Sequence, residues 1–180
     1  MGSATPHAGE NQAGAAPFRA RVITVSDRCS RKEAEDVSGP LAADLLTEFG
    51  VTSDVVVVPD GAESVREAIG AAARDGVQIV FTTGGTGLSP RDQTPEATEP
   101  LLTMRIDGLA EAIRRRGSAH VPAAVLSRGM AGVIGTGDSA VLVVNAPGSP
   151  GGVRDAVAVL GPLVSHVLEQ LAGQDHQHQA

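Results

Sequence analysis

The chain has 180 residues, a net charge of −7, a single cysteine and neither tryptophan nor tyrosine. This length is typical of one domain, and a hydrophobic fraction of 42% is sufficient for a packed core. The acidic charge argues against a nucleic-acid partner, and the lone Cys29 excludes an intramolecular disulfide and a cysteine-based zinc site. With no signal-peptide pattern and no apolar run near the ~20 residues of a membrane span, we expect a cytoplasmic protein.

The two ends of the chain lack core-forming residues. Residues 1–17 consist mainly of Gly, Ala, Pro and small polar residues, and the C-terminal GQDHQHQA is similarly polar. Burial of such segments cannot offset the entropy lost on ordering. We therefore predict disordered tails at 1–17 and 173–180 around a single domain at 18–172.

The first half of this domain alternates strands and helices. We predict strands at 19–26, 55–58 and 77–82, and helices at 38–49 and 63–74. Ser38 is a candidate N-cap of its helix, and Gly50 follows that helix where glycine commonly terminates one. The unbroken apolar run Val55–Val58 is typical of a fully buried strand.

The second half continues the alternation. A helix begins at Thr94-Pro95 with Thr94 as N-cap, and others are predicted at 109–116 and from Ser149-Pro150 to Leu171, the last kinked by Gly161-Pro162. Strands are predicted at 125–127 and 140–144. This order predicts a three-layer α/β fold, with a mostly parallel central sheet covered by helices on both faces.

Four unusual clusters each follow a predicted strand. They are Ser26-Asp27-Arg28, Pro59-Asp60-Gly61, Thr82 through Gly87, and Asn145-Ala146-Pro147-Gly148. In a parallel α/β sheet these positions meet at the carboxyl edge, where ligands bind. The sequence therefore predicts one composite site at this edge.

The TTGGTG segment is a candidate phosphate-binding loop. Glycine at 84, 85 and 87 lets backbone amides approach an anion, and Thr83 and Thr86 add hydroxyls. It is not a P-loop, because the chain's only lysine is Lys32, and Pro90 breaks the dinucleotide-binding pattern. A plain tight turn is the alternative interpretation.

Two carboxylates lie close to this loop in the predicted topology. Asp92 and Asp60 would repel a phosphate unless a cation lies between them, and Mg²⁺ binds carboxylates and substrate phosphates together. Each also has a structural alternative, Asp92 as a helix cap and Asp60 as a turn residue before Gly61. Asn145, before Pro147-Gly148, could contact a nucleobase or ribose, or only connect a strand to a helix.

In this order the clusters resemble the molybdopterin adenylyltransferase family, the Mog/MoaB-type proteins of molybdenum-cofactor synthesis, and the related domains of gephyrin-like proteins. The resemblance spans about Ala20 to Leu171. It is carried by SDR with DVSGP, PDG, TTGGTG, SPRDQTPEAT, VPAAVLSR and NAPGSP. TTGGTG followed by R-D-x-T-P-E-A-T is its most specific part.

The resemblance implies the molybdenum cofactor biosynthesis protein-like fold, assembly as a homotrimer, and transfer of AMP from ATP to molybdopterin with Mg²⁺. It implies catalytic and metal-binding roles for Asp60 and Asp92. The positions that it implies for nucleotide or phosphate binding are Thr83, Gly84, Gly85, Thr86, Gly87, Ser127, Asn145, Pro147 and Gly148, and those for the pterin are Ser26, Asp27 and Ser118.

Two other functions remain open at this point. One is a pterin-binding or scaffolding protein without adenylyl transfer, and the other is a different nucleotide-dependent enzyme on the same fold, such as a pyrophosphatase-like relative. Further partners among molybdenum-cofactor enzymes are also conceivable.

Overall fold

In the computed structural model the described residues are 18–173, which form one six-stranded sheet with helices on both faces. The predicted tails lie outside these residues, except for Gly173. The sheet order is β2-β1-β3-β6-β5-β4. The strands are β1 (Phe18–Val25), β2 (Val51–Val58), β3 (Ile79–Thr83), β4 (Met104–Arg105), β5 (Ala131–Ile134) and β6 (Val141–Ala146).

The sheet is mixed but mostly parallel. Strands β2, β1, β3 and β6 run parallel to one another, whereas β5 is antiparallel to β6 and β4 is antiparallel to β5. The predicted α/β fold class is therefore confirmed, with an antiparallel extension at one edge. The carboxyl ends of the four parallel strands consequently lie along one edge of the sheet.

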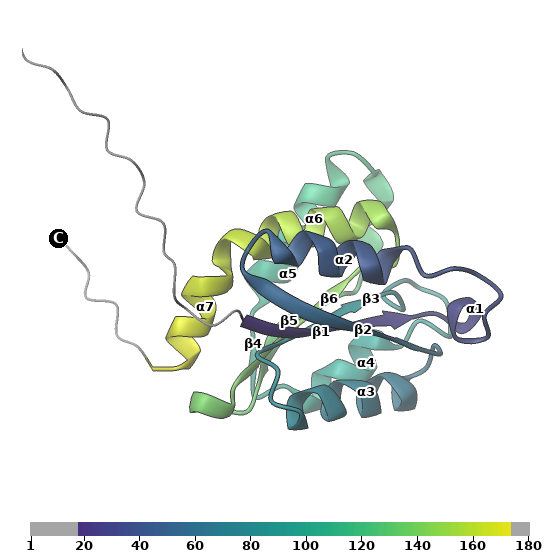
Figure 1. Ribbon diagram of the computed structural model, residues 1–180. Helices are drawn as coiled ribbons and strands as arrows, with labels where there is room; N and C mark the ends of the chain where they lie inside the picture. The colour runs from purple at the N-terminus through teal and green to yellow at the C-terminus, as the bar shows by residue number, and fades with distance from the viewer. Residues whose placement is uncertain (1–17, 174–180) are drawn as a thin grey trace, which may run out of the picture.

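Two helical layers cover the sheet (Figure 1). The α-helices are α1 (Asp27–Ser30), α2 (Ser38–Thr47), α3 (Ala62–Arg74), α4 (Thr94–Thr98), α5 (Asp107–Ser118), α6 (Pro150–Leu160) and α7 (Val164–Leu171). Short 3-10 segments are η1 (Glu99–Leu101), η2 (Pro122–Leu126), η3 (Gly137–Ser139) and η4 (Gly161–Leu163). Helices α2, α5 and α6 lie on one face, and α3 and α4 on the other.

Each face of the sheet has its own apolar core, because successive side chains along a strand point to opposite faces. Val22, Phe81 and Leu142 belong to the core under α2, α5 and α6. Ile23 and Val80 belong to the core under α3 and α4. The central strands β3 and β6 are buried along their whole length, so their ends are fixed points for the loops that follow.

Two sequence predictions differ from the structure, and two short strands were not predicted. The run Val55–Val58 is not fully buried, because β2 is the outer strand of the sheet and the side chain of Val57 is 39% exposed. The predicted strand at 125–127 is wrong: Pro122 begins the 3-10 helix η2, whose last residue is Leu126. The real strands β4 and β5 have only two and four residues, too short for a period to be recognised.

The predicted helix starts need smaller corrections. Helix α2 begins at Ser38, but the Ser38 hydroxyl donates to the carbonyl oxygen of Gly148 instead of capping the helix. Thr94 lies within α4 and the N-cap is Gln93. The kink at Gly161-Pro162 is confirmed by η4 between α6 and α7.

Candidate active site

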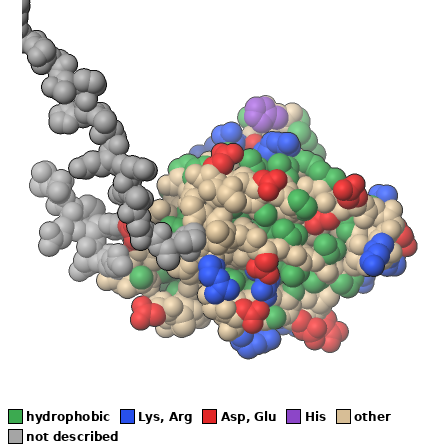
Figure 2. All heavy atoms as spheres, viewed as in Figure 1, with side chains coloured by type: hydrophobic (Ala, Val, Ile, Leu, Met, Phe, Trp, Pro, Cys, Tyr) green, Lys and Arg blue, Asp and Glu red, His purple; other side chains and the backbone are tan. Residues whose placement is uncertain are grey.

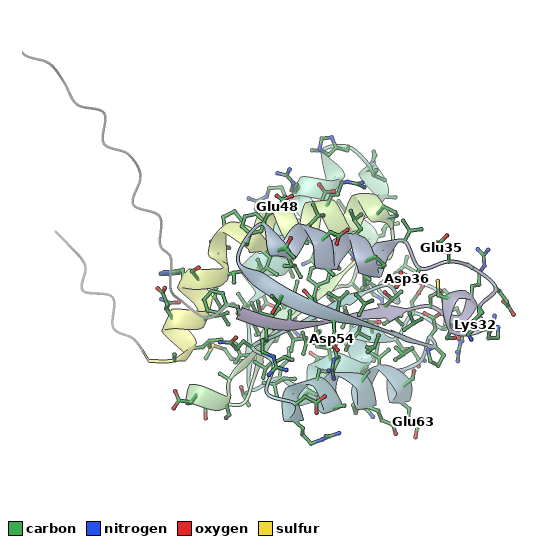
Figure 3. All side chains as sticks on the ribbon, viewed as in Figure 1. Lys32, Glu35, Asp36, Glu48, Asp54 and Glu63 are labelled. Carbon is green, nitrogen blue, oxygen red and sulfur yellow. The ribbon has the colours of Figure 1, made fainter. Side chains whose placement is uncertain are left out.

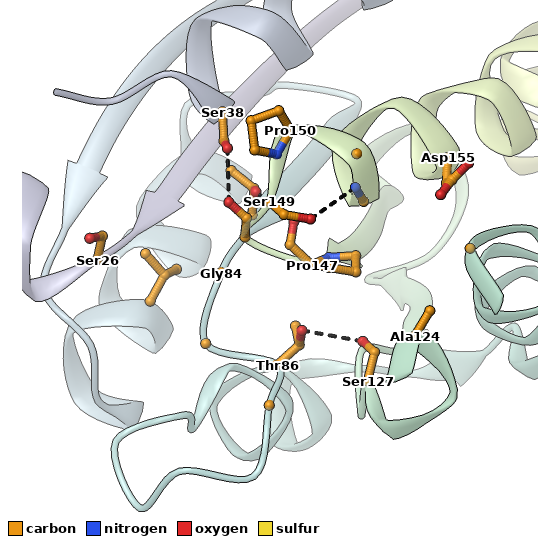
Figure 4. Close-up of a pocket in the computed structure, with 18 of the residues that line it drawn as sticks. Ser26, Ser38, Gly84, Thr86, Ala124, Ser127, Pro147, Ser149, Pro150 and Asp155 are labelled. Carbon is orange, nitrogen blue, oxygen red and sulfur yellow. Dashed lines mark hydrogen bonds between the residues drawn. The ribbon is translucent and has the colours of Figure 1, made fainter. Parts of the chain in front are cut away.

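A large cleft opens at the carboxyl edge of the parallel strands, with a volume of about 1190 Å³. The ends of β1 and β3, the first residues of α2 and α6, and the segment 120–127 form its walls. Most of the predicted site residues line it (Figure 4). These are Ser26, Asp60, Thr83, Gly84, Gly85, Thr86, Gly87, Asp92, Ser127, Pro147 and Gly148.

The loop after β3 presents three consecutive backbone amides without partners. Within residues 18–173, no protein acceptor receives a hydrogen bond from the amides of Gly85, Thr86 or Gly87. Unpaired amides at buried or half-buried positions are costly, because buried N–H groups are nearly always hydrogen-bonded. Successive N–H groups of this kind form an anion-binding concavity, so the loop is suited to phosphate.

The conformation of this loop is fixed from behind by its carbonyl groups. The Thr94 hydroxyl donates to the Gly84 oxygen over 2.9 Å, and the Thr94 amide donates to the Gly85 oxygen over 3.0 Å. Gly84 has a φ of +106°, and a Cβ there would be 2.3 Å from the Val25 oxygen. Glycine is therefore required at position 84 both for the backbone angle and for the approach to β1.

Three further hydrogen bonds join the cleft walls. The Thr83 hydroxyl donates to the Pro147 oxygen over 2.9 Å, which ties β3 to the turn before α6. Figure 4 shows the bonds from Ser38 to Gly148 and between the hydroxyls of Ser127 and Thr86, 3.2 Å apart. The walls are thus held together independently of any ligand.

The carboxylates of Asp60 and Asp92 are each bound on one side only. Oδ2 of Asp60 accepts from the Asp27 amide over 2.7 Å, and Oδ2 of Asp92 accepts from the Ser89 amide over 2.9 Å. Among residues 18–173, no hydrogen bond reaches Oδ1 of either carboxylate. Both line the cleft, so each has an oxygen available to a ligand.

The donor set fits Mg²⁺, which binds one or two protein carboxylates together with substrate phosphate oxygens. Within the described part of the chain, no cluster of three or more His, Cys, Asp or Glu side chains could hold a metal ion. Asp60 and Asp92 are the predicted cleft carboxylates that could hold such an ion, with phosphate oxygens completing its ligands.

Asp27, in contrast, is engaged on both oxygens. Nη2 of Arg91 lies 2.9 Å from Oδ1, and Nε of Arg91 donates to Oδ2 over 3.2 Å. This hydrogen-bonded ion pair with Arg91 holds the pKa of the Asp27 carboxyl below its usual range. Asp27 does not line the cleft, so the structure places it behind Asp60 rather than facing a ligand.

Two other predicted residues also lie outside the cleft lining. Asn145 is 3% exposed, and its amide nitrogen donates to the hydroxyls of Thr82 and Thr98 over 3.0 and 3.2 Å. The Ser118 hydroxyl donates to the Arg115 carbonyl of its own helix, and the neighbouring Gly117 lines the cleft instead. Asn145 is thus a buried support of the sheet edge, since its amide is used within the protein.

Several charged cleft residues had no predicted role. Asp36 lines the cleft from the connection between α1 and α2, where Figure 3 labels it beside Glu35. It accepts from the Thr24 hydroxyl over 2.7 Å and from the Gly39 amide over 2.9 Å, so it fixes the start of α2. Arg114 from α5 and Arg154 from α6 also line the cleft and bring positive charge to it.

Arg128 is the residue that sequence reasoning missed most clearly. It contacts the loop from behind through the Gly87 and Asp92 carbonyl oxygens, although it does not line the cleft. The available sequence signal for Arg128 was its position in the VPAAVLSR motif, directly after the predicted site residue Ser127. Nothing in the local pattern showed which loop it would reach.

The molecular surface carries no single dominant charge on the face viewed in Figure 2, where acidic and basic side chains are interspersed. None of the helices in residues 18–173 has the length and apolar character needed to cross a membrane.

Comparison with known proteins identifies the family. Residues 21–166 match the model of a protein family that is described as a probable molybdopterin binding domain. The chain belongs to this molybdopterin-binding family. The membership confirms the family that the motifs predicted, and it places the chain in molybdenum cofactor biosynthesis.

Individual members of the molybdopterin-binding family are similar over most of the chain. The molybdopterin adenylyltransferase of Pyrococcus furiosus is 36% identical over 153 residues, which cover 84% of this chain and 90% of that protein. A molybdenum cofactor biosynthesis bifunctional protein of Synechococcus elongatus is 39% identical over 87% of this chain, and the chain spans only 48% of its length. The cinnamon protein of Drosophila melanogaster is matched over 25% of its length.

The fold of the molybdopterin-binding family is shared as well. A molybdopterin biosynthesis protein of Mycobacterium abscessus superposes with a TM-score of 0.80 at 46% identity, covering 87% of this chain and 97% of that one. The expected molybdenum cofactor biosynthesis protein-like fold is thereby confirmed.

Proposed function

We propose that this protein transfers AMP from ATP to the terminal phosphate of molybdopterin, giving adenylated molybdopterin and pyrophosphate. The observation that carries the proposal is the row of unpaired backbone amides at Gly85, Thr86 and Gly87 in the cleft. The same cleft is lined by Asp60 and Asp92, each of which has only one of its two carboxylate oxygens hydrogen-bonded within the described residues. Similar proteins named molybdopterin adenylyltransferase support the reaction type.

The chemistry needs positioning more than activation of a nucleophile. A terminal phosphate oxygen of the pterin attacks the α-phosphorus of ATP; that P–O bond forms while the bond to the bridging oxygen breaks and pyrophosphate leaves. The amides of Gly85, Thr86 and Gly87 donate to phosphate oxygens and stabilise the charge that develops on them. Holding both substrates in one cleft supplies the orientation that the step requires.

The carboxylates define where a cation belongs. Bound Mg²⁺ would neutralise phosphate charge and polarise the P–O bonds. Asp60 and Asp92 each offer Oδ1 to such an ion while Oδ2 stays on a backbone amide, so the side chains are oriented before substrates arrive. A cation between the carboxylates and the phosphates would also explain why two acidic residues line a cleft that is suited to anions.

We assign the two substrates to different parts of the cleft. The loop Thr83–Gly87 with Ser127, Pro147 and Gly148 takes the nucleotide phosphates, and Ser26 contacts the pterin. Asp27 and Ser118 support these walls from outside the lining, and Asn145 does so from the core. The protein acts as a cytoplasmic homotrimer in this proposal, which light scattering at micromolar concentration and cell fractionation would test.

The experiment is incubation of the full-length chain with molybdopterin, ATP and Mg²⁺, with pyrophosphate measured and the product identified by mass spectrometry. We expect one pyrophosphate for each adenylated molybdopterin, and loss of both when Mg²⁺ is omitted. Tight molybdopterin binding without pyrophosphate release would instead establish a scaffolding protein. Hydrolysis of ATP without the pterin would establish a pyrophosphatase-like enzyme.

A further inference from the structure

The guanidinium of Arg128 joins Gly87 and Asp92, the two residues that flank an exposed segment, residues 88–91. Nε donates to the Gly87 oxygen over 2.9 Å, and Nη2 donates to the Asp92 oxygen over 2.6 Å. Leu88, Ser89, Pro90 and Arg91 between them are exposed. The planar guanidinium therefore fixes the separation between Gly87, the last residue of the amide row, and Asp92, whose carboxylate lies beside it.

The position of Arg128 is itself determined from two sides. Its amide donates to the Thr86 oxygen over 2.8 Å, and Nη1 pairs with the Glu96 carboxylate. The hydrogen bond from Arg128 lowers the pKa of Glu96, so this partner stays charged at neutral pH. The Arg128 side chain is only 35% exposed, which favours a defined geometry.

Asp92 lies very close to the loop at this point. A Cβ at Gly87 would be 2.8 Å from Oδ2 of Asp92, so the carboxylate packs against the last residue of the amide row. The hydrogen bonds between Asp92 and Ser89 are local to this exposed segment and do not connect it to the Thr83–Gly87 loop. Thr94 anchors the chain two residues later through a hydrogen bond that does not involve Arg128.

We propose that Arg128 is a positioning residue, which holds the Asp92 carboxylate at the distance from the Thr83–Gly87 loop that a phosphate-bound cation requires. This inference rests on the proposed adenylyl transfer. Arg128 faces the carbonyl side of the loop, so it acts through Asp92 and Gly87 and contacts no substrate. A lysine has one point charge and cannot span both carbonyls, so it would restore only part of the effect.

The test compares full-length wild type with Arg128→Gln, Arg128→Lys and the matched control Arg105→Gln. Arg105 is a surface arginine with ion pairs to Glu99 and Asp107, away from the cleft lining. For Arg128→Gln we expect kcat to fall about 10- to 100-fold and the Mg²⁺ concentration for half-maximal rate to rise by a similar factor. The KM for molybdopterin should change little, Arg128→Lys should be intermediate, and Arg105→Gln should behave like wild type.

A second readout does not need turnover. Calorimetry of ATP binding with and without Mg²⁺ should show that Arg128→Gln loses most of the Mg²⁺-dependent gain in affinity, and hydrogen exchange of residues 88–92 should accelerate. If the wild type forms no adenylated product, the proposed function fails, yet this comparison still decides the role of Arg128. Wild-type kcat and Mg²⁺ dependence in a folded Arg128→Gln protein would overturn the inference.

Glu96→Gln separates positioning from simple stabilisation. It removes the charge of the ion pair, but the amide oxygen can still accept from Nη1, and the bonds from Arg128 to the Gly87 and Asp92 oxygens remain. The changes in kcat and in Mg²⁺ dependence should therefore be much smaller than in Arg128→Gln. If Arg128→Gln does not fold, the same measurements on Arg128→Lys take its place. A loss in Glu96→Gln as large as that in the Arg128 variants would also overturn the inference.

Discussion

Asp27 and Asp60 exchange hydrogen bonds between backbone and carboxylate. The Asp27 amide donates to Oδ2 of Asp60 over 2.7 Å, and the Asp60 amide donates to Oδ1 of Asp27 over 3.1 Å. The two residues follow the adjacent parallel strands β1 and β2. The pairing locks the carboxyl ends of these strands together and leaves Oδ1 of Asp60, a residue that lines the cleft, without a hydrogen bond from the described residues.

Asp60→Asn should lower adenylyl transfer and keep the fold. The amide oxygen can still accept from the Asp27 amide, whereas the charge offered to a cation is lost. Pyrophosphate release at saturating ATP and Mg²⁺ measures the effect, and circular dichroism checks the fold. Asp27→Asn is the matched comparison and should retain more activity, because Asp27 lies outside the cleft lining. The reverse order of activities would mean that Asp27 contacts a substrate.

Asp92→Asn should reduce turnover by roughly a hundred- to thousand-fold, the range found when a well-placed electrostatic contact is removed. The near-isosteric amide can still accept from the Ser89 amide, so the melting temperature should hardly change. The same pyrophosphate assay measures the loss. A folded variant with near wild-type turnover would mean that the Asp92 carboxylate only orders its own loop.

The Asp27–Arg91 ion pair should make stability depend on pH in the acid range. Arg91 holds the pKa of Asp27 below its ordinary value, so the pair contributes stability that is fully present above about pH 4 and is lost as the pH falls through the lowered pKa. Melting temperatures of wild type and Arg91→Gln should differ at pH 7 at low salt and converge as the pH falls through the lowered pKa of Asp27. A difference that does not narrow in acid would assign the effect of Arg91 to packing.

Gly84→Ala should destabilise the protein more than Gly50→Ala. Both residues have positive φ, +106° and +73°, but a Cβ at position 84 would be 2.3 Å from the Val25 oxygen, and none of the described atoms lies within 4 Å of one at position 50. We expect a loss of about 1–2 kcal/mol of unfolding free energy for Gly50→Ala from the backbone angle alone. Overpacking should add roughly 1–3 kcal/mol for Gly84→Ala. Urea unfolding measures both, and equal losses would contradict the close approach.

Asn145→Ala should lower stability by about 1–3 kcal/mol, because it leaves buried hydrogen-bonding groups around Thr82, Thr98 and Met130 without their partner. Urea unfolding at neutral pH gives this value. The control is Ser139→Ala, which removes an exposed hydroxyl bonded to Thr136 and should change the unfolding free energy by less than about 0.5 kcal/mol. A stable Asn145→Ala protein with weakened ATP binding would favour a ligand contact instead.

The sequence alone determined the features that depend on local chemistry. Apolar periodicity and Gly or Pro boundaries placed the main helices and the strands β1, β3 and β6, since both signals act over a few residues. The alternation of strands and helices predicted the parallel sheet and therefore the edge where Asp60, Asp92 and the glycine loop meet. The motifs TTGGTG and SPRDQTPEAT were sufficient for the family.

Only the tertiary structure decided which residues reach the cleft and which support it. Asn145 follows β6 as predicted, but its amide is used by Thr82 and Thr98 in the core. Arg128 is 36 residues from Asp92 in sequence, and its role exists only because η2 and the antiparallel strand β5 bring it behind the loop. Such long-range hydrogen bonds depend on how elements pack, and no local period or spacing encodes them.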